Sequence, residues 1–154
     1  LEALPFPEHM QRVPEYAGGH HEKMDGEGYP RGLFAGDMSL PARMLAIADV
    51  FEALTATDRP YKKPKKLSEA MRIMGFMKKD AHLDPELLDL FVREGVYREY
   101  ARRYMPDELV DEVDEEALFA MEAVAVELPA AEERAERTKS FRPEYEGLVR
   151  RTES

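Results

Sequence analysis

Two histidines and several carboxylates precede a glycine-rich turn near the start of the chain. Residues 20–30 read His-His-Glu-Lys-Met-Asp-Gly-Glu-Gly-Tyr-Pro. Imidazole nitrogen and carboxylate oxygen together suit Fe, Mn or Zn better than Ca. Neighbouring helical residues point about 100° apart, so His20 and His21 would each reach a different ion. The stretch indicates part of a multi-metal centre; the alternative is a solvated histidine pair before an acidic loop.

A carboxylate in an apolar helix supplies a third candidate ligand, Asp49. Positions 45, 46 and 53 around it are Leu, Ala and Ala. A carboxylate against such a surface costs several kcal/mol unless a cation or hydrogen-bond donors compensate it. A metal shared with His20 and His21 would compensate it, and an ion pair with Arg43 or another basic side chain is the alternative. The apolar residues of this segment have the spacing of a buried helical face: Met44, Ile47, Ala48, Phe51 and Leu54.

Basic residues gather around two prolines, which prevent a regular helix there: Arg59, Lys62, Lys63, Lys65 and Lys66. Such a cluster is commonly a solubilising loop. Its functional interpretation is a cationic arm over a phosphodiester, because Arg donates to two oxygens and Lys supplies a point charge. The chain carries a net charge of −10, so the extended basic surface that duplex nucleic acid needs is not expected. A small dianionic nucleotide fits better.

The glycine-rich turn has two interpretations of its own. Gly26 and Gly28 can permit positive φ in a tight turn before Tyr29 and Pro30. Alternatively, the glycines let the backbone approach a ligand, and Tyr29 can stack on a base. The turn alone would not select a nucleotide.

Several motifs follow one another in a recognisable order: His20-His21-Glu22 with Asp25-Gly26, then Gly28-Tyr29-Pro30, then residues 48–55, and then Asp58-Arg59-Pro60-Tyr61-Lys62. With these motifs, the chain from about residue 4 to residue 114 resembles the HD-GYP family of cyclic di-GMP phosphodiesterases. The resemblance implies an all-α bundle of the HD-domain phosphohydrolase type, truncated at its N-terminus, and a signalling hydrolase.

The same resemblance implies roles for the candidate metal ligands. His20, His21 and Asp49 would be ligands of two or three divalent metal ions, with Fe or Mn expected. Glu52 lies where the family has a second acidic group near the attacking water, and is the candidate catalytic residue. The reaction would be metal-assisted hydrolysis of a 3′-5′ phosphodiester, giving pGpG or GMP.

The resemblance also implies a substrate and a partner. Arg59 and Lys62 would face the guanylate phosphates of the cyclic dinucleotide, with Gly28 and Tyr29 beside it. The Gly-Tyr-Pro loop would be a surface for partners, including diguanylate cyclase domains. The alternative function is therefore a non-catalytic signalling module that binds nucleotide or protein through this loop, and a purely structural helical fragment is a third.

One departure from the family bears on activity. The family's bridging His-Asp pair and further ligands lie upstream of the His-His-Glu motif, and this sequence contains no His-Asp dipeptide. His9 and His82 are interpreted as surface or capping residues. Three side chains cannot close two coordination spheres, so we expect an incomplete site in this chain alone. Because the first residue is Leu, we expect a longer protein with the missing motif upstream.

Helices without alternating strands are expected along the whole chain. Ser39, Ser68 and Asp84 are the predicted N-caps, and Gly95 the predicted helix end. The expected helices run from about 15 to 22, from 39 through Asp49, from 68 to 79, from 84 to 95, from 96 to 104 and from 107 onward.

The C-terminal part is expected to differ from the rest. Residues 1–115 are assigned to the HD-GYP-like domain, and residues 116–154 to a helix over 117–128 followed by an acidic, partly disordered tail from 130. The absence of Cys excludes disulfides and thiolate metal sites. No apolar run is long enough to cross a bilayer, and a cytoplasmic location is expected. Apolar surface left by missing helices would favour a homo-oligomer.

Overall fold

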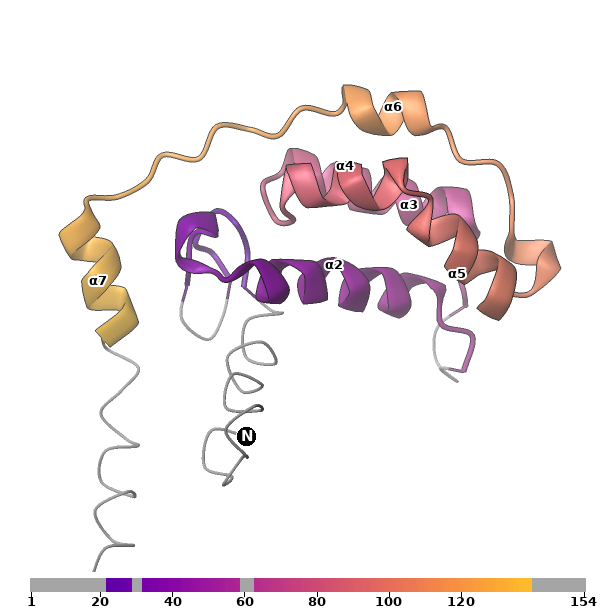
Figure 1. Cartoon of the computed structure of the whole chain (residues 1–154), viewed down its shortest axis with the longest axis horizontal. Coiled ribbons are helices and arrows are strands. Elements are labelled where there is room, and N and C mark those ends of the chain that lie inside the picture. The colour runs from indigo at the N-terminus through magenta and orange to yellow at the C-terminus, as the bar shows by residue number, and fades with distance from the viewer. Residues whose placement is uncertain (1–21, 29–31, 59–62, 140–154) are drawn as a thin grey trace, which may run out of the picture.

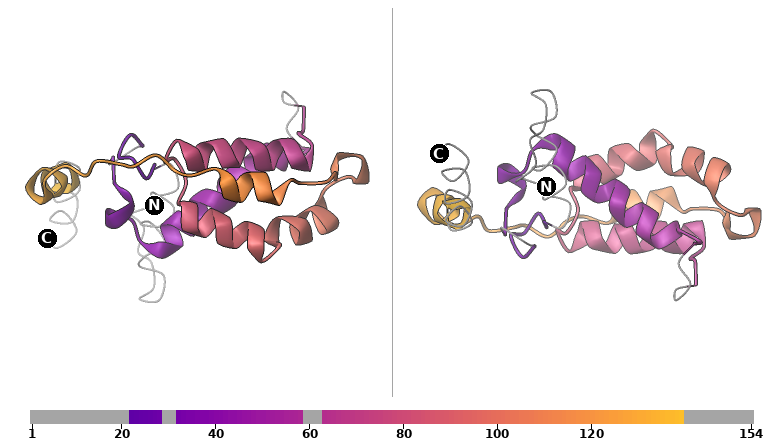
Figure 2. Two further views of the ribbon diagram at one scale, coloured as in Figure 1. Left: turned by 90° about the horizontal axis from the view of Figure 1, so that it is seen from above. Right: turned by 90° about the horizontal axis from the view of Figure 1, so that it is seen from below.

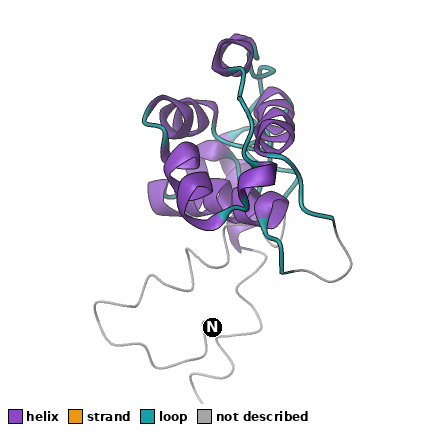
Figure 3. Ribbon diagram, turned by 90° about the vertical axis from the view of Figure 1, so that its right-hand side faces the viewer, coloured by secondary structure: helices purple, strands orange, loops and turns teal. Residues whose placement is uncertain are grey.

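The computed structural model describes residues 22–28, 32–58 and 63–139. Within these ranges the chain is helical and contains no strand (Figure 3), which confirms the expected all-α fold. The predicted helix over 15–22 lies outside the described residues, apart from Glu22, which is not helical. The helices are η2 (Ala35–Asp37), α2 (Leu40–Thr55), α3 (Leu67–Lys79), α4 (Pro85–Arg93), α5 (Val96–Tyr104), η3 (Asp107–Leu109), α6 (Glu115–Ala120) and α7 (Ala131–Lys139).

Local sequence signals place the ends of α2 and α4. Ser39 caps α2 by accepting a hydrogen bond from the backbone N–H of Ala42 at 3.4 Å, and Asp84 caps α4 through the N–H of Leu87 at 3.1 Å. A proline lies in the first turn of both helices. Gly95 separates α4 from α5 with a φ of +66°, a left-handed conformation that glycine adopts without strain. These predictions are confirmed.

The predicted cap at Ser68 is wrong. α3 begins at Leu67, and its N-cap position is Lys66, which makes no side-chain cap. Ser68 instead donates its hydroxyl and its backbone N–H to the Asp111 carboxylate, at 2.6 Å and 2.7 Å. Burial alone would raise the pKa of Asp111. The hydrogen bonds from Ser68 and the positive charge of Lys66 outweigh burial, so the pKa of Asp111 is lowered. A free backbone N–H at the start of α3 thus bonds to a carboxylate distant in sequence, and no local side chain caps the helix.

The helices pack in three layers (Figures 1 and 2). α2 crosses one face of the pair formed by α3 and α4, and α6 lies along the opposite face of that pair. The aromatic ring of Phe51 from α2 meets Phe91 and Tyr100 edge-on, with centroids 5.3 Å and 5.2 Å away. Two methionines of α3 lie in this core, which includes Ile47, Leu67, Met71, Met74, Leu88, Val92 and Tyr97.

The C-terminal segment departs from the predicted long helix over 117–128. α6 ends at Ala120, and an extended segment leads to α7 (Figure 1). Lys78 Nζ donates to the Leu118 carbonyl at 2.7 Å, and the Val124 N–H donates to the Lys79 carbonyl at 2.9 Å. In a continuous helix, the Leu118 carbonyl and the Val124 N–H would bond to backbone groups of that same helix. Here both groups bond to residues of α3 instead.

The helix expected from residue 107 is a single 3-10 turn, η3. In the tail expected to be partly disordered, residues 131–139 form α7. Residues 140–154 lie outside the described part, so partial disorder of the tail stays a prediction. The division of the chain after residue 115 stays a prediction, and Leu118 of α6 packs in the main core. None of the described helices is both long and apolar enough to cross a membrane.

Candidate functional site

The segment that follows the two histidines folds back on itself. The Glu22 side chain is buried, and its carboxylate accepts the backbone N–H of Leu33 at 2.9 Å. The Ala35 N–H donates to the Met24 carbonyl at 3.3 Å. These bonds join residues 22–24 to residues 33–35, and we call the described residues 22–28 and 32–35 the glycine loop. Glu22, the first residue after the histidine pair, is therefore held at the base of this loop.

The glycines of the loop are required for different reasons. Gly26 has a φ of +82°, which confirms the expected positive φ. Gly28 has no positive φ, so that part of the expectation is wrong. A Cβ at Gly28 would lie 2.3 Å from the Lys23 backbone nitrogen and 2.5 Å from Glu22 Cα. Gly28 is therefore needed because the chain's own backbone passes beside it. Tyr29, predicted beside the nucleotide, lies outside the described residues.

The glycine loop rests on the first turns of α2. Met24 from the loop, Met38 and Ala42 form a small buried cluster separate from the main core. Leu33 and Ala35 pack against it. The base of the loop is thus held on the helix that carries Asp49.

Asp49 lies on the exposed side of α2, not on the buried side that was predicted. Ile47 and Phe51 face the core as expected, but Met44 and Ala48 are exposed. The desolvation argument for Asp49 is therefore wrong for the described residues. α2 has apolar side chains on two faces, so their spacing alone could not identify the buried one.

The exposed side of α2 combines acidic and apolar residues. Met44 and Leu45 are 55% and 41% exposed, and Asp49 and Glu52 are also exposed. Residues three or four apart share one face of a helix, so these side chains form one surface. We call it the outer face of α2: Met44, Leu45, Ala48, Asp49 and Glu52. No described element covers it (Figure 1).

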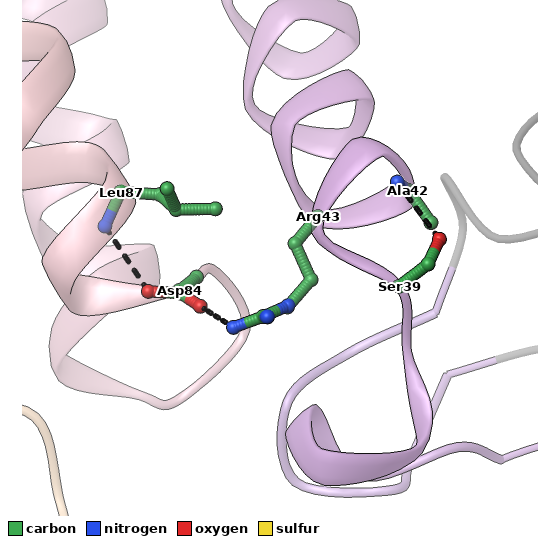
Figure 4. A network of polar contacts seen from close by, with 5 residues as sticks. All are labelled: Ser39, Ala42, Arg43, Asp84 and Leu87. Carbon is green, nitrogen blue, oxygen red and sulfur yellow. Dashed lines mark hydrogen bonds and ion pairs between the residues drawn. The ribbon is translucent and has the colours of Figure 1, made fainter.

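Arg43 pairs with Asp84 and not with Asp49, so the Arg43 part of that alternative is wrong. Its Nη1 atom lies 2.5 Å from Asp84 Oδ2, and Figure 4 shows the guanidinium reaching from α2 to the start of α4. Asp84 is buried. Sequence analysis identified Asp84 as a cap but missed this ion pair, because no local pattern links residues on two different helices.

The candidate metal ligands lie only partly within the described chain. His20 and His21 are outside it, and among residues 22–28, 32–58 and 63–139 no group of three or more His, Asp or Glu side chains could hold a metal. Asp49 is exposed and can offer its carboxylate. The donor chemistry fits a first-row metal, but the described residues alone do not close a coordination sphere.

The basic cluster is also partly outside the described chain. Arg59 and Lys62, predicted to face phosphates, are not described. Lys65 pairs with Glu69 at 2.7 Å on the surface of α3. His82, predicted to be a surface or capping residue, is half-buried, and its Nε2 lies 3.9 Å from Asp25 Oδ2 of the glycine loop. No local pattern in the sequence predicts that His82 approaches Asp25.

Comparison with known proteins places the chain in a family. The model of the HD domain family matches residues 1–87, more than half of the sequence. The chain therefore belongs to the HD domain family, as its helical fold and motifs predict.

Its relatives include phosphodiesterases of cyclic dinucleotides. The 3′3′-cGAMP-specific phosphodiesterase 1 of Vibrio cholerae is 49% identical over 83 residues, which are 54% of this chain and 19% of that protein. A cyclic di-GMP phosphodiesterase of Pseudomonas aeruginosa is 47% identical over 79 residues, 51% of this chain and 18% of that protein. One of Thermotoga maritima is 38% identical over 84 residues, 54% and 22% of the two chains. The matched segments thus span about a fifth of these relatives, and they confirm the resemblance read from the motifs.

Proposed function

We propose that this chain is the C-terminal part of a metal-dependent phosphodiesterase domain that hydrolyses cyclic di-GMP. The relatives act, by their names, on cyclic di-GMP or on 3′3′-cGAMP. Both are cyclic dinucleotides, which supports the substrate class.

The outer face of α2 is the observation that carries this proposal. Asp49 and Glu52 are three residues apart on one exposed helix face, and Met44 and Leu45 beside them are apolar and half exposed. Carboxylates with apolar side chains beside them suit a site that a further segment covers. Covering the site removes water, and the attraction between the carboxylates and a bound cation then becomes stronger. This face would be one wall of the metal centre.

Each candidate residue has a proposed role. His20, His21 and Asp49 bind two or three divalent ions, Fe or Mn. Such ions, when bound, polarise a phosphoryl oxygen and lower the pKa of a water molecule. Glu52 orients that water and takes up its proton.

The substrate is held by a second group of residues. Arg59 and Lys62 offset the charge that develops on the phosphate. Gly28 and Tyr29 lie beside the nucleotide. The Gly-Tyr-Pro loop also offers a surface to protein partners such as diguanylate cyclase domains.

The missing ligands must come from residues outside the described part. A centre of two metals needs more than the three proposed side chains. Residues of this chain outside the described part, or a second copy of the chain in a homo-oligomer, would supply the further ligands.

A non-catalytic binding module is the second candidate. The observation that favours it is that the sequence contains no His-Asp dipeptide, so this chain does not supply the bridging pair that the family resemblance implies. In this case the Gly-Tyr-Pro loop and the basic cluster would bind nucleotide or protein without hydrolysis.

Metal analysis of the purified chain, followed by calorimetric titration with cyclic di-GMP, separates these functions. Two or more Fe or Mn ions per chain, with binding and hydrolysis of cyclic di-GMP, would support a site that the chain or its oligomer completes. Binding without metal or hydrolysis would favour the binding module. No binding of cyclic di-GMP would contradict the proposed function and would leave a module that binds a protein partner, or a purely structural role.

A further inference from the structure

One buried carboxylate joins two helices near the candidate site. Asp84 is 6% exposed and precedes α4. Its Oδ1 atom accepts the Leu87 N–H at 3.1 Å, and its Oδ2 atom accepts from Arg43 Nη1 of α2 at 2.5 Å (Figure 4). The start of α4 and the first turns of α2 are thus held by the same side chain.

The Arg43–Asp84 pair is better shielded from water than the pair of Lys65 and Glu69. The side chains of Asp84 and Arg43 are 8% and 26% exposed, whereas those of Lys65 and Glu69 are 27% and 45% exposed. Exposed pairs contribute little because water and salt screen them. A charge-assisted hydrogen bond in a shielded place is stronger, so the Arg43–Asp84 pair can fix helix positions.

Two routes connect this ion pair to the glycine loop. The first runs through α2, because Ala42, next to Arg43, packs with Met24 of the loop. The second runs through the turn between α3 and α4, where His82 Nε2 lies 3.9 Å from Asp25 Oδ2 of the loop. The glycine loop therefore approaches α2 and the turn that leads into α4, and Asp84 joins α2 to the start of α4.

We infer that Arg43 and Asp84 are positioning residues, whose ion pair holds the glycine loop in a fixed relation to the helix that carries Asp49. Neither residue lies on the outer face of α2, so their effect passes through the helix and the loop. The consequence for cyclic di-GMP rests on the proposed function, whereas the consequence for the loop does not.

Amide hydrogen exchange of the full chain tests this inference. Asp84→Ser keeps a good N-cap for α4 but is too short to reach Arg43, and Arg43→Ala removes the guanidinium. In both variants we expect the Leu33 and Ala35 amides to exchange about tenfold faster, as for the loss of one charge-assisted hydrogen bond. The α4 amides, including Leu88, should keep their protection.

Two further variants serve as controls. Arg43→Lys retains a cationic donor and should restore most of the loop protection. Glu69→Gln removes the exposed ion pair with Lys65 and should leave the loop amides unchanged.

Two results would overturn the inference. One is unchanged loop exchange in folded Asp84→Ser and Arg43→Ala. The other is equal acceleration throughout α4, which would mean a general loss of stability. If Asp84→Ser does not fold, the comparison of Arg43→Ala with Arg43→Lys decides.

Binding of cyclic di-GMP adds a second readout. If the wild-type chain binds it, the pair-breaking variants should bind it more weakly, and Arg43→Lys should recover the affinity. If the wild-type chain does not bind it, the proposed function is contradicted for this chain, while the exchange comparison still decides the inference.

Discussion

Gly28 lies against the backbone of Lys23 so closely that a Cβ at position 28 would be 2.3 Å from the Lys23 nitrogen. Real Cβ atoms do not approach backbone this closely, so Gly28→Ala must displace part of the glycine loop. We expect a loss of about 1–3 kcal/mol in the free energy of unfolding, as for other overpacked positions. Urea denaturation followed by circular dichroism measures it.

Gly36→Ala is the matched control for this prediction. Its added Cβ would meet only Arg134 Nη1, at 3.7 Å, an ordinary contact. Equal stability losses in Gly28→Ala and Gly36→Ala would contradict the account of the glycine loop.

Lys78 links α3 to both α4 and α6. It is buried, and its Nζ donates to Asp89 Oδ1 at 2.9 Å and to the Leu118 carbonyl at 2.7 Å. Lys78→Met keeps the apolar stem but removes both hydrogen bonds, so we expect a loss of about 2 kcal/mol in the free energy of unfolding. The amide of Val124, bonded to the end of α3, should exchange faster because α6 and the following segment loosen.

The control for Lys78 is a lysine on the surface of the same helix bundle. Lys65→Met removes a pair with Glu69 that is largely exposed, and its effect on unfolding should be small. If Lys78→Met is as stable as Lys65→Met, the proposed anchoring of α6 is incorrect.

Alkaline pH should destabilise the fold through Tyr97. Burial, together with the hydrogen bond and negative charge of Glu115, raises the pKa of Tyr97 from 10.0 to about 12. The folded state therefore favours the protonated phenol, and this contribution to stability is complete below pH 10 and is lost as the pH rises toward 12. Thermal melting from pH 9 upward should show it as a steeper decline than in Tyr97→Phe, which has no phenol to ionise. Parallel declines in the two proteins would exclude Tyr97 as the cause.

The sequence predicted α4 and α5 well because their ends depend on local chemistry. Asp84 followed by proline starts α4, and Gly95 adopts the left-handed conformation that separates the two helices. The segment after Leu118 could not be predicted in this way, since Lys78 and Lys79 bond to its backbone from a helix distant in sequence. Tertiary hydrogen bonds there override a helical pattern.

The sequence predicted which residues make up the candidate site but not which way their side chains face. The motifs identified Asp49 and Glu52 correctly as residues of one helix, α2. The apolar neighbours of Asp49 predicted a desolvated carboxylate, but Asp49 is exposed, as are the apolar residues Met44 and Ala48. The pair of Arg43 and Asp84 was not foreseen, because nothing in the sequence aligns α2 with the start of α4.

The central claim is that Asp49 is a ligand of a metal centre on the outer face of α2. The most direct test is a Mn²⁺ titration of the full chain, followed by electron paramagnetic resonance, for wild type, Asp49→Asn and the control Asp80→Asn, which alters another exposed aspartate. The account predicts Mn²⁺ binding that Asp49→Asn weakens by about tenfold or more and that Asp80→Asn leaves unchanged. Equal Mn²⁺ affinity in wild type and Asp49→Asn would contradict it.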